Sequence, residues 1–163
     1  MPRLTRILLP ALGLLVAIGT LFFGLALGGG ANAPLLGDPG IVVRYALPTT
    51  KLLVDLSAAT MIGALVLALW ALARTDVAYR KSIDIAAGAA GVLTVSSVAT
   101  GILTFVSVSN TPFSASPAYG QQLWFFFTNI ALGTSWLWTI GLAAGVTVLC
   151  IAVTNQTALF FVG

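Results

Sequence analysis

The chain contains no histidine among its 163 residues, which removes the commonest protein ligand for haem iron and for transition metals. This absence also rules out an HExxH zinc motif and a Ser/His/Asp catalytic system. The single cysteine, Cys150, excludes an internal disulfide and a CxxC motif. Met1, Met61 and Cys150 are too scattered to predict a soft copper(I) site. We therefore predict that the chain is not an enzyme and has no catalytic, cofactor-binding or metal-binding residues.

Charged residues are also scarce, at 7% of the chain, whereas 59% of the residues are hydrophobic and the mean hydropathy is +1.07. A soluble domain of this composition would expose large apolar patches to water. The sequence therefore predicts an integral membrane protein whose first partner is the lipid bilayer. The basic pI does not indicate nucleic-acid binding, because the basic residues lie at the ends of apolar stretches, where the positive-inside rule accounts for them.

Four long apolar stretches predict an all-α fold, a polytopic transmembrane helical bundle that forms a single domain over residues 1–163. The predicted spanning helices cover approximately residues 7–27, 47–73, 85–108 and 123–153. The first stretch could instead be a signal peptide, since Ala31-Asn32-Ala33 resembles a cleavage site. Its apolar run of about 21 residues exceeds the roughly 7–15 of a signal peptide, however, and favours a retained helix.

The basic residues predict the orientation of these helices. Most of them precede the first helix or lie between the second and third, a distribution that places both regions in the cytoplasm and gives an N-in, C-in topology. The connections over residues 28–44 and 109–122 are then expected to face outward. The basic residues on the cytoplasmic side are Arg3, Arg6, Arg74, Arg80 and Lys81.

The fourth stretch is too long for one membrane span. A helix over residues 123–153 would be roughly 46 Å long, against a hydrocarbon core of roughly 30 Å. Part of it must therefore tilt or lie in the interface, and Trp124 to Phe127 form the predicted interfacial part because aromatic rings favour the headgroup level. Beyond Asn155-Gln156 the chain becomes apolar again. This last segment predicts the start of a fifth helix, and with it a fragment of a longer protein.

Arg44, Lys51 and Asp55 form a polar cluster on one stripe of the second predicted helix, at 100° per residue. An unpaired carboxylate at Asp55 would cost about 2.5–3.5 kcal/mol in the centre of a span, so Lys51, one turn away, is its expected partner. Two interpretations stay open. The cluster is either a site for an ion or a proton, or a structural ion pair that fixes the outer end of the helix and docks the loop containing Asp38.

Small residues predict where helices approach one another in the membrane. Gly24 and Gly28 form one GxxxG pattern, and Gly141 and Gly145 form another, while the third predicted helix is rich in glycine, serine and threonine. These patterns predict a packed bundle rather than a dimer.

Several short stretches match one known kind of protein: Gly37-Asp38-Pro39-Gly40, Val43-Arg44, Leu47-Pro48, Leu52-Leu53, Asp55-Leu56, Gly63 to Ala68, Leu132-Gly133, Trp136-Leu137-Trp138 and Asn155 to Leu159. Through them the chain resembles the opening of a large actinobacterial membrane protein. That family joins a copper-resistance D domain to a CtaG-type cytochrome c oxidase assembly domain. The resemblance implies a protein that handles copper across the membrane or delivers it to the oxidase, with histidine-bearing segments beyond Gly163. Asp38, Arg44 and Asp55 are the polar positions it shares with this chain.

We therefore predict the N-terminal part of a copper-handling, cytochrome c oxidase assembly factor in the bacterial plasma membrane. The chain itself is expected to be non-catalytic, to bind no cofactor, and to meet copper only through regions beyond it. The alternative is a small accessory transmembrane subunit that stabilises cytochrome c oxidase or another respiratory complex. A transporter half is less well supported, because neither an inverted repeat nor a pair of broken helices is visible in the sequence.

Overall fold

The computed structural model describes residues 3–30, 32, 38–73, 77–111 and 113–159. Within these residues the chain is all-helical, and four of its five helices are long and apolar enough to cross a membrane. This confirms the predicted all-α bundle with four spanning helices. The helices are α1 (Arg3–Leu27), α2 (Ile41–Trp70), α3 (Val77–Ser109), α4 (Pro117–Asn129) and α5 (Ala131–Leu159), and all except α4 are candidate spans.

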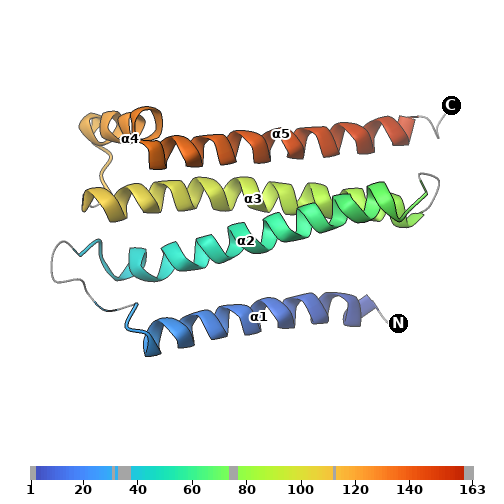
Figure 1. Ribbon diagram of the computed structural model, residues 1–163, viewed down its shortest axis with the longest axis horizontal. Coiled ribbons are helices and arrows are strands. Elements are labelled where there is room, and N and C mark those ends of the chain that lie inside the picture. Colours follow the sequence, from blue (N-terminus) through green and yellow to red (C-terminus); the bar gives the residue numbers. More distant parts are fainter. Residues whose placement is uncertain (1–2, 31, 33–37, 74–76, 112, 160–163) are drawn as a thin grey trace.

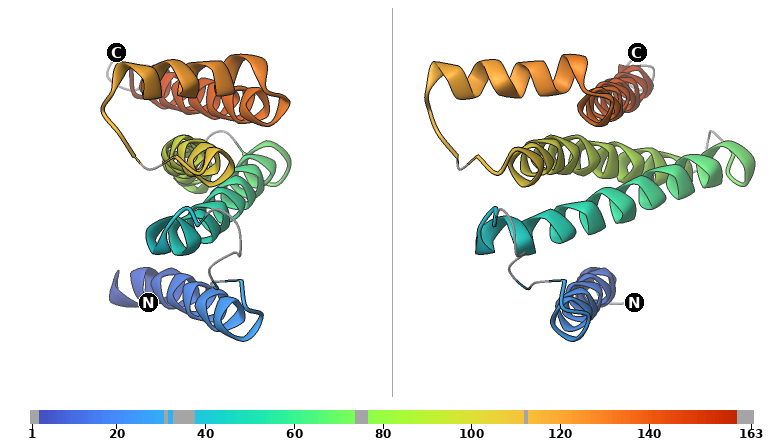
Figure 2. Two further views of the ribbon diagram at one scale, coloured as in Figure 1. Left: turned by 90° about the vertical axis from the view of Figure 1, so that its left-hand side faces the viewer. Right: turned by 60° about the vertical axis from the view of Figure 1, so that its left-hand side comes forward.

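The four long helices lie side by side in a row, in the order α1, α2, α3 and α5 (Figures 1 and 2). The short helix α4 lies at the start of α5 and crosswise to it, beside the last turns of α3, at the end of the bundle that we call the α4 end (Figures 1 and 2). The start of α1 and the end of α5 both lie at the opposite end, which we call the termini end (Figure 1). A chain with four spans has both termini on one side of the membrane, as the predicted N-in, C-in topology requires.

Helix α3 is the centre of the bundle, because α2 packs against one side of it and α5 against the other. Its buried residues include larger apolar side chains such as Leu103 and Phe105, but most are small or hydroxylated, and Ala86, Ala90, Ser97 and Thr100 have no exposed surface. Such side chains let helix backbones approach closely in lipid, where apolar burial alone gives little driving force. Most of the buried hydroxyls donate to carbonyls of their own helix, as Thr100 does to Ser96 at 2.7 Å.

Helix α1 is attached loosely by comparison. Within the described residues it contacts only α2, and none of its window Pro10–Leu27 is buried. One contact is an edge-on pair of rings at the α4 end, where the centroids of Phe22 and Tyr45 are 5.8 Å apart.

The long fourth stretch of the sequence is broken into two helices. Ile130 has an extended backbone (φ −102°, ψ 127°) and separates α4 from α5, so the single helix expected over residues 123–153 is wrong. Trp124 and Phe125 fall on α4, and their side chains are exposed at the α4 end of the bundle. The predicted interfacial placement therefore stays a prediction for Trp124 and Phe125. Phe126, which the prediction included, is instead buried in the core between the helices.

Other helix boundaries also differ from the expected ones. Helix α2 begins at Ile41 rather than near residue 47, and α3 begins at Val77 rather than near residue 85. Helix α5 continues through Asn155 and Gln156 to Leu159, so no helix break occurs there. Arg74 and residues 160–163 lie outside the described residues.

The start of α4 follows from local sequence. The Ser116 hydroxyl accepts the N–H of Tyr119 at 3.3 Å, and Pro117 occupies the first helical position, where its missing N–H costs no hydrogen bond. Rings then hold α4 against α3: Phe105 lies 5.4 Å from Tyr119 and 5.5 Å from Phe126, centroid to centroid. Val43 of α2 completes this core.

Close helix contacts are made by glycines other than those of the GxxxG patterns. A Cβ added at Gly101 would lie 3.0 Å from the Phe127 ring, and one added at Gly133 would overlap the backbone of Phe126. At Gly141 and Gly145 no atom lies within 4 Å of that position. The Gly141–Gly145 pattern is therefore not a helix contact within this chain, contrary to our expectation.

Candidate functional site

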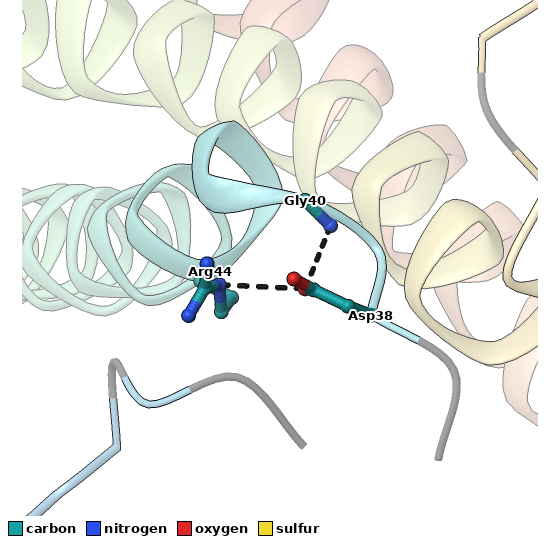
Figure 3. Close-up of polar contacts among 3 residues, drawn as sticks. All are labelled: Asp38, Gly40 and Arg44. Atoms are coloured by element: carbon teal, nitrogen blue, oxygen red, sulfur yellow. Dashed lines mark hydrogen bonds and ion pairs between the residues drawn. The ribbon is translucent and has the colours of Figure 1, made fainter. Parts of the chain in front are cut away.

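Three of the four predicted site residues lie on α2, and the fourth lies just before it. Asp38 folds back over the first turn of α2: its Oδ1 accepts the N–H of Gly40 at 2.9 Å and lies 3.4 Å from Nε of Arg44 (Figure 3). Gly40 has φ 93°, a left-handed conformation that side chains disfavour, which explains glycine at the point where the loop enters the helix. The loop is thus docked by Arg44 and Asp38.

Lys51 and Asp55 do not form the ion pair that their spacing predicts. Both side chains are exposed, and within the described residues no ion pair joins them. The order of the two residues explains this difference. Side chains on a helix lean toward its N-terminus, so Lys51 leans away from Asp55, and an acid placed before a base at this spacing pairs better than the reverse order.

Asp55 lies nearer to the middle of its helix than the sequence indicated. Because α2 runs from Ile41 to Trp70, Asp55 is at the middle of a helix about 45 Å long, some 21 Å from its start. Lys51 is about 6 Å nearer to the α4 end. A lysine at this depth can extend its amine toward the headgroups, whereas an aspartate is too short to do so. Asp55 is therefore the most costly charge to expose to lipid among the described residues.

The α4 end also contains a cavity that sequence reasoning did not predict. It has a volume of about 590 Å³ and lies between the end of α3, helix α4 and Ile130. Phenylalanine rings form much of its wall, the amides of Gln121 and Gln122 and the hydroxyl of Ser109 are its polar groups, and no lining side chain is charged. Such a cavity suits an uncharged, largely apolar molecule rather than an ion. The cavity exists because the chain bends at Ile130. This residue is neither glycine nor proline, so the sequence at that position does not predict a bend.

Tyr119 lies on α4 next to Ala118, which lines this cavity, but Tyr119 itself is not part of the lining. Burial raises the pKa of the Tyr119 hydroxyl, and its oxygen is buried without a hydrogen-bond partner among the described residues. A buried hydroxyl left unbonded costs free energy. Nothing in its surroundings activates it as a proton donor or acceptor.

Residues that could hold a metal ion are not gathered in the described part of the chain, where no group of three or more His, Cys, Asp and Glu side chains lies together. Cys150 is buried on α5, beside a smaller apolar cavity that it shares with Tyr79 and Leu65. Asp38 and Asp55 lie at different depths along the bundle, so the two carboxylates do not form a common site.

Comparison with known protein families gives a match over most of the chain. A family model described as copper resistance protein D-like, N-terminal domain, matches residues 41–163. The matched segment begins with the first residue of α2 and includes Arg44, Lys51 and Asp55, whereas Asp38 and α1 precede it. No curated protein and no solved structure matches the chain.

Proposed function

Since the chain belongs to the family of copper resistance protein D-like N-terminal domains, we propose that it is a non-catalytic membrane module of a copper-handling system. The observation that carries this proposal is the family match, which covers α2, α3, α4 and α5. The four apolar spanning helices fit a multi-pass membrane protein, and we place it in the bacterial plasma membrane, with both termini in the cytoplasm.

In this proposal the chain supplies a membrane framework and other regions or partners bind the copper. The central position of α3 supports a framework role, because α2 and α5 both pack against it and many of its buried side chains are small, which allows close helix spacing. Copper delivered in this way would reach a copper-dependent enzyme such as cytochrome c oxidase, and the chain would act in the assembly of that enzyme.

The exposed charges of α2 favour a second candidate function. Lys51 and Asp55 face out of the chain at membrane depth, and α1 is unburied along its span. A small accessory subunit of a respiratory complex would present such surfaces to a larger partner. Copper tolerance distinguishes the two candidates, because an accessory subunit has no reason to affect it, even where the complex that it stabilises is cytochrome c oxidase.

The test is deletion of the gene in its host, followed by measurement of copper tolerance and of the copper content of purified cytochrome c oxidase. We expect both to fall, and the intact chain to restore them. A Gly141→Ala form serves as a control that should restore both equally, because that position is open. Unchanged copper tolerance and oxidase copper would refute the copper-handling proposal, and loss of a respiratory complex with normal copper tolerance would support the accessory subunit.

A further inference from the structure

The cavity at the α4 end is built entirely from the uncharged part of the chain. No charged residue follows Asp84 in the sequence, and every residue that lines the cavity comes after it. The volume of about 590 Å³ lies within the usual range for sites that bind small molecules, about 300–1,000 Å³. The cavity therefore has the size of a ligand site, and its lining offers no charge to bind an ion or a phosphate group.

Three phenylalanine side chains line the cavity from two helices. Phe105 on α3 and Phe126 on α4 are buried, with their ring centroids 5.5 Å apart, so the core holds both rings in place. Phe125, the third, is 58% exposed, so a ligand can reach its ring. Aromatic rings contact one another favourably at centroid distances of about 4.5–7 Å. The lining thus favours a flat, apolar ring as the bound group.

Two side-chain amides supply the polar groups that are available to a ligand. Gln121 and Gln122 line the cavity from α4, and neither side-chain amide makes a hydrogen bond within the described residues. The hydroxyl of Ser109, by contrast, is already hydrogen-bonded to Thr111. Each amide has N–H groups that can donate to a carbonyl oxygen. A ligand that matches this cavity therefore combines a flat ring with carbonyl acceptors.

The position of the cavity in the bundle adds a third condition. The cavity lies beside the last turns of α3, a helix about 50 Å long, against a hydrocarbon core of about 30 Å. The end of such a helix reaches the boundary between acyl chains and headgroups. Val108 and Ile130 keep 60% and 40% of their surface exposed, so the cavity opens at the surface of the bundle. A ligand thus enters from the membrane and can leave an apolar tail in the lipid.

We propose that the cavity at the α4 end binds a lipid-soluble quinone. A quinone has a flat, uncharged ring, two carbonyl acceptors and an apolar tail. In this site the ring lies against the three phenylalanines, while the amides of Gln121 and Gln122 donate to the carbonyl oxygens. A phospholipid fits less well, because the lining offers no cation to its phosphate. The proposal concerns binding alone and does not depend on the copper-handling role.

Thermal unfolding of the full chain in lipid nanodiscs, with added decylubiquinone, tests the proposal. Ala118→Trp fills the cavity from an exposed lining position, and Ala115→Trp is the matched control, because Ala115 is also exposed but lies outside the lining. At a hundred times its Kd the quinone should raise the Tm of the wild type and of Ala115→Trp by about 5–10 °C. It should leave the Tm of Ala118→Trp unchanged. No increase in the wild type, or equal increases in the two variants, would overturn the proposal.

The same titration tests the chemistry of the site. Gln121→Ala and Gln122→Ala should each raise the Kd for decylubiquinone about three- to tenfold, because each removes one hydrogen bond. Thr128→Ala is their control and should bind as the wild type does, because the Thr128 hydroxyl bonds within α4 and lies outside the lining. Dioleoylglycerol, an uncharged lipid with ester carbonyls but no ring, should not compete. Unchanged binding by both glutamine variants would overturn the proposal, and equally tight binding of dioleoylglycerol would make the cavity a lipid site instead.

Discussion

The bend between α4 and α5 gives the sharpest prediction about stability. Gly133 lies in the first turn of α5, directly under the end of α4, and is buried. A Cβ at this position would overlap the carbonyl oxygen of Phe126 and come within 2.6 Å of its carbonyl carbon. Those atoms are backbone, so no change of side-chain rotamer relieves the clash. Gly133→Ala must therefore push α4 away from α5.

The size of the effect follows from two opposing terms. Over-packing costs about 1–3 kcal/mol, and a clash with backbone lies at the upper end of that range. Replacing glycine by alanine inside a helix recovers about 1 kcal/mol of helix propensity. Gly133→Ala should thus lose about 2 kcal/mol in the free energy of unfolding, which lowers Tm by roughly 4–8 °C.

Gly141→Ala is the matched control, because Gly141 lies on the same helix with no atom within 4 Å of an added Cβ. It gains the propensity term without the clash, so its Tm should equal or exceed that of the wild type. Thermal unfolding of both variants in the same detergent, followed by circular dichroism, measures the difference. A Gly133→Ala form as stable as the Gly141→Ala form would show that α4 does not rest on α5 as described.

Other outcomes concern the two ends of the bundle. Asp38→Ala should lower the unfolding free energy by about 0.5–1 kcal/mol, because its ion pair with Arg44 is partly exposed; thermal unfolding should show Asp38→Asn to be intermediate, since the amide still accepts from the backbone. Burial raises the pKa of Tyr119 in the folded protein, so the hydroxyl ionises at a lower pH in the unfolded chain than in the folded one. The free energy of unfolding therefore falls as the pH rises above about 10. Tyr119→Phe should reduce the fall in Tm between about pH 9 and pH 11, and an identical fall would contradict this assignment. The predicted topology, with both termini in the cytoplasm, requires that a cysteine at Ala78 resist an impermeant thiol reagent added outside cells and that one at Ser114 react with it; the reverse pattern would refute this topology.

The sequence by itself determined the number of spanning helices. Whether a stretch can cross the membrane depends on its own length and hydropathy, matched to a bilayer of nearly constant thickness, and neither requires knowledge of distant residues. The same local logic identified the region of Asp38, Arg44, Lys51 and Asp55, because charges inside apolar stretches are visible in sequence alone.

Only the tertiary structure decided how those elements meet. The break at Ile130 has no glycine or proline at that residue to mark it, and it accompanies the packing of Phe126 beneath the first turn of α5. Gly101 and Gly133 lie where an added Cβ would meet a neighbouring helix, whereas Gly141 has no atom within 4 Å of that position. All three lie in similar apolar helical sequence, so the sequence does not distinguish them. Arg44, rather than Lys51, docks the loop at Asp38, because the path of the loop brings that carboxylate over the first turn of α2. Contacts of this kind depend on where the chain returns in space, which residue type and spacing along one helix do not specify.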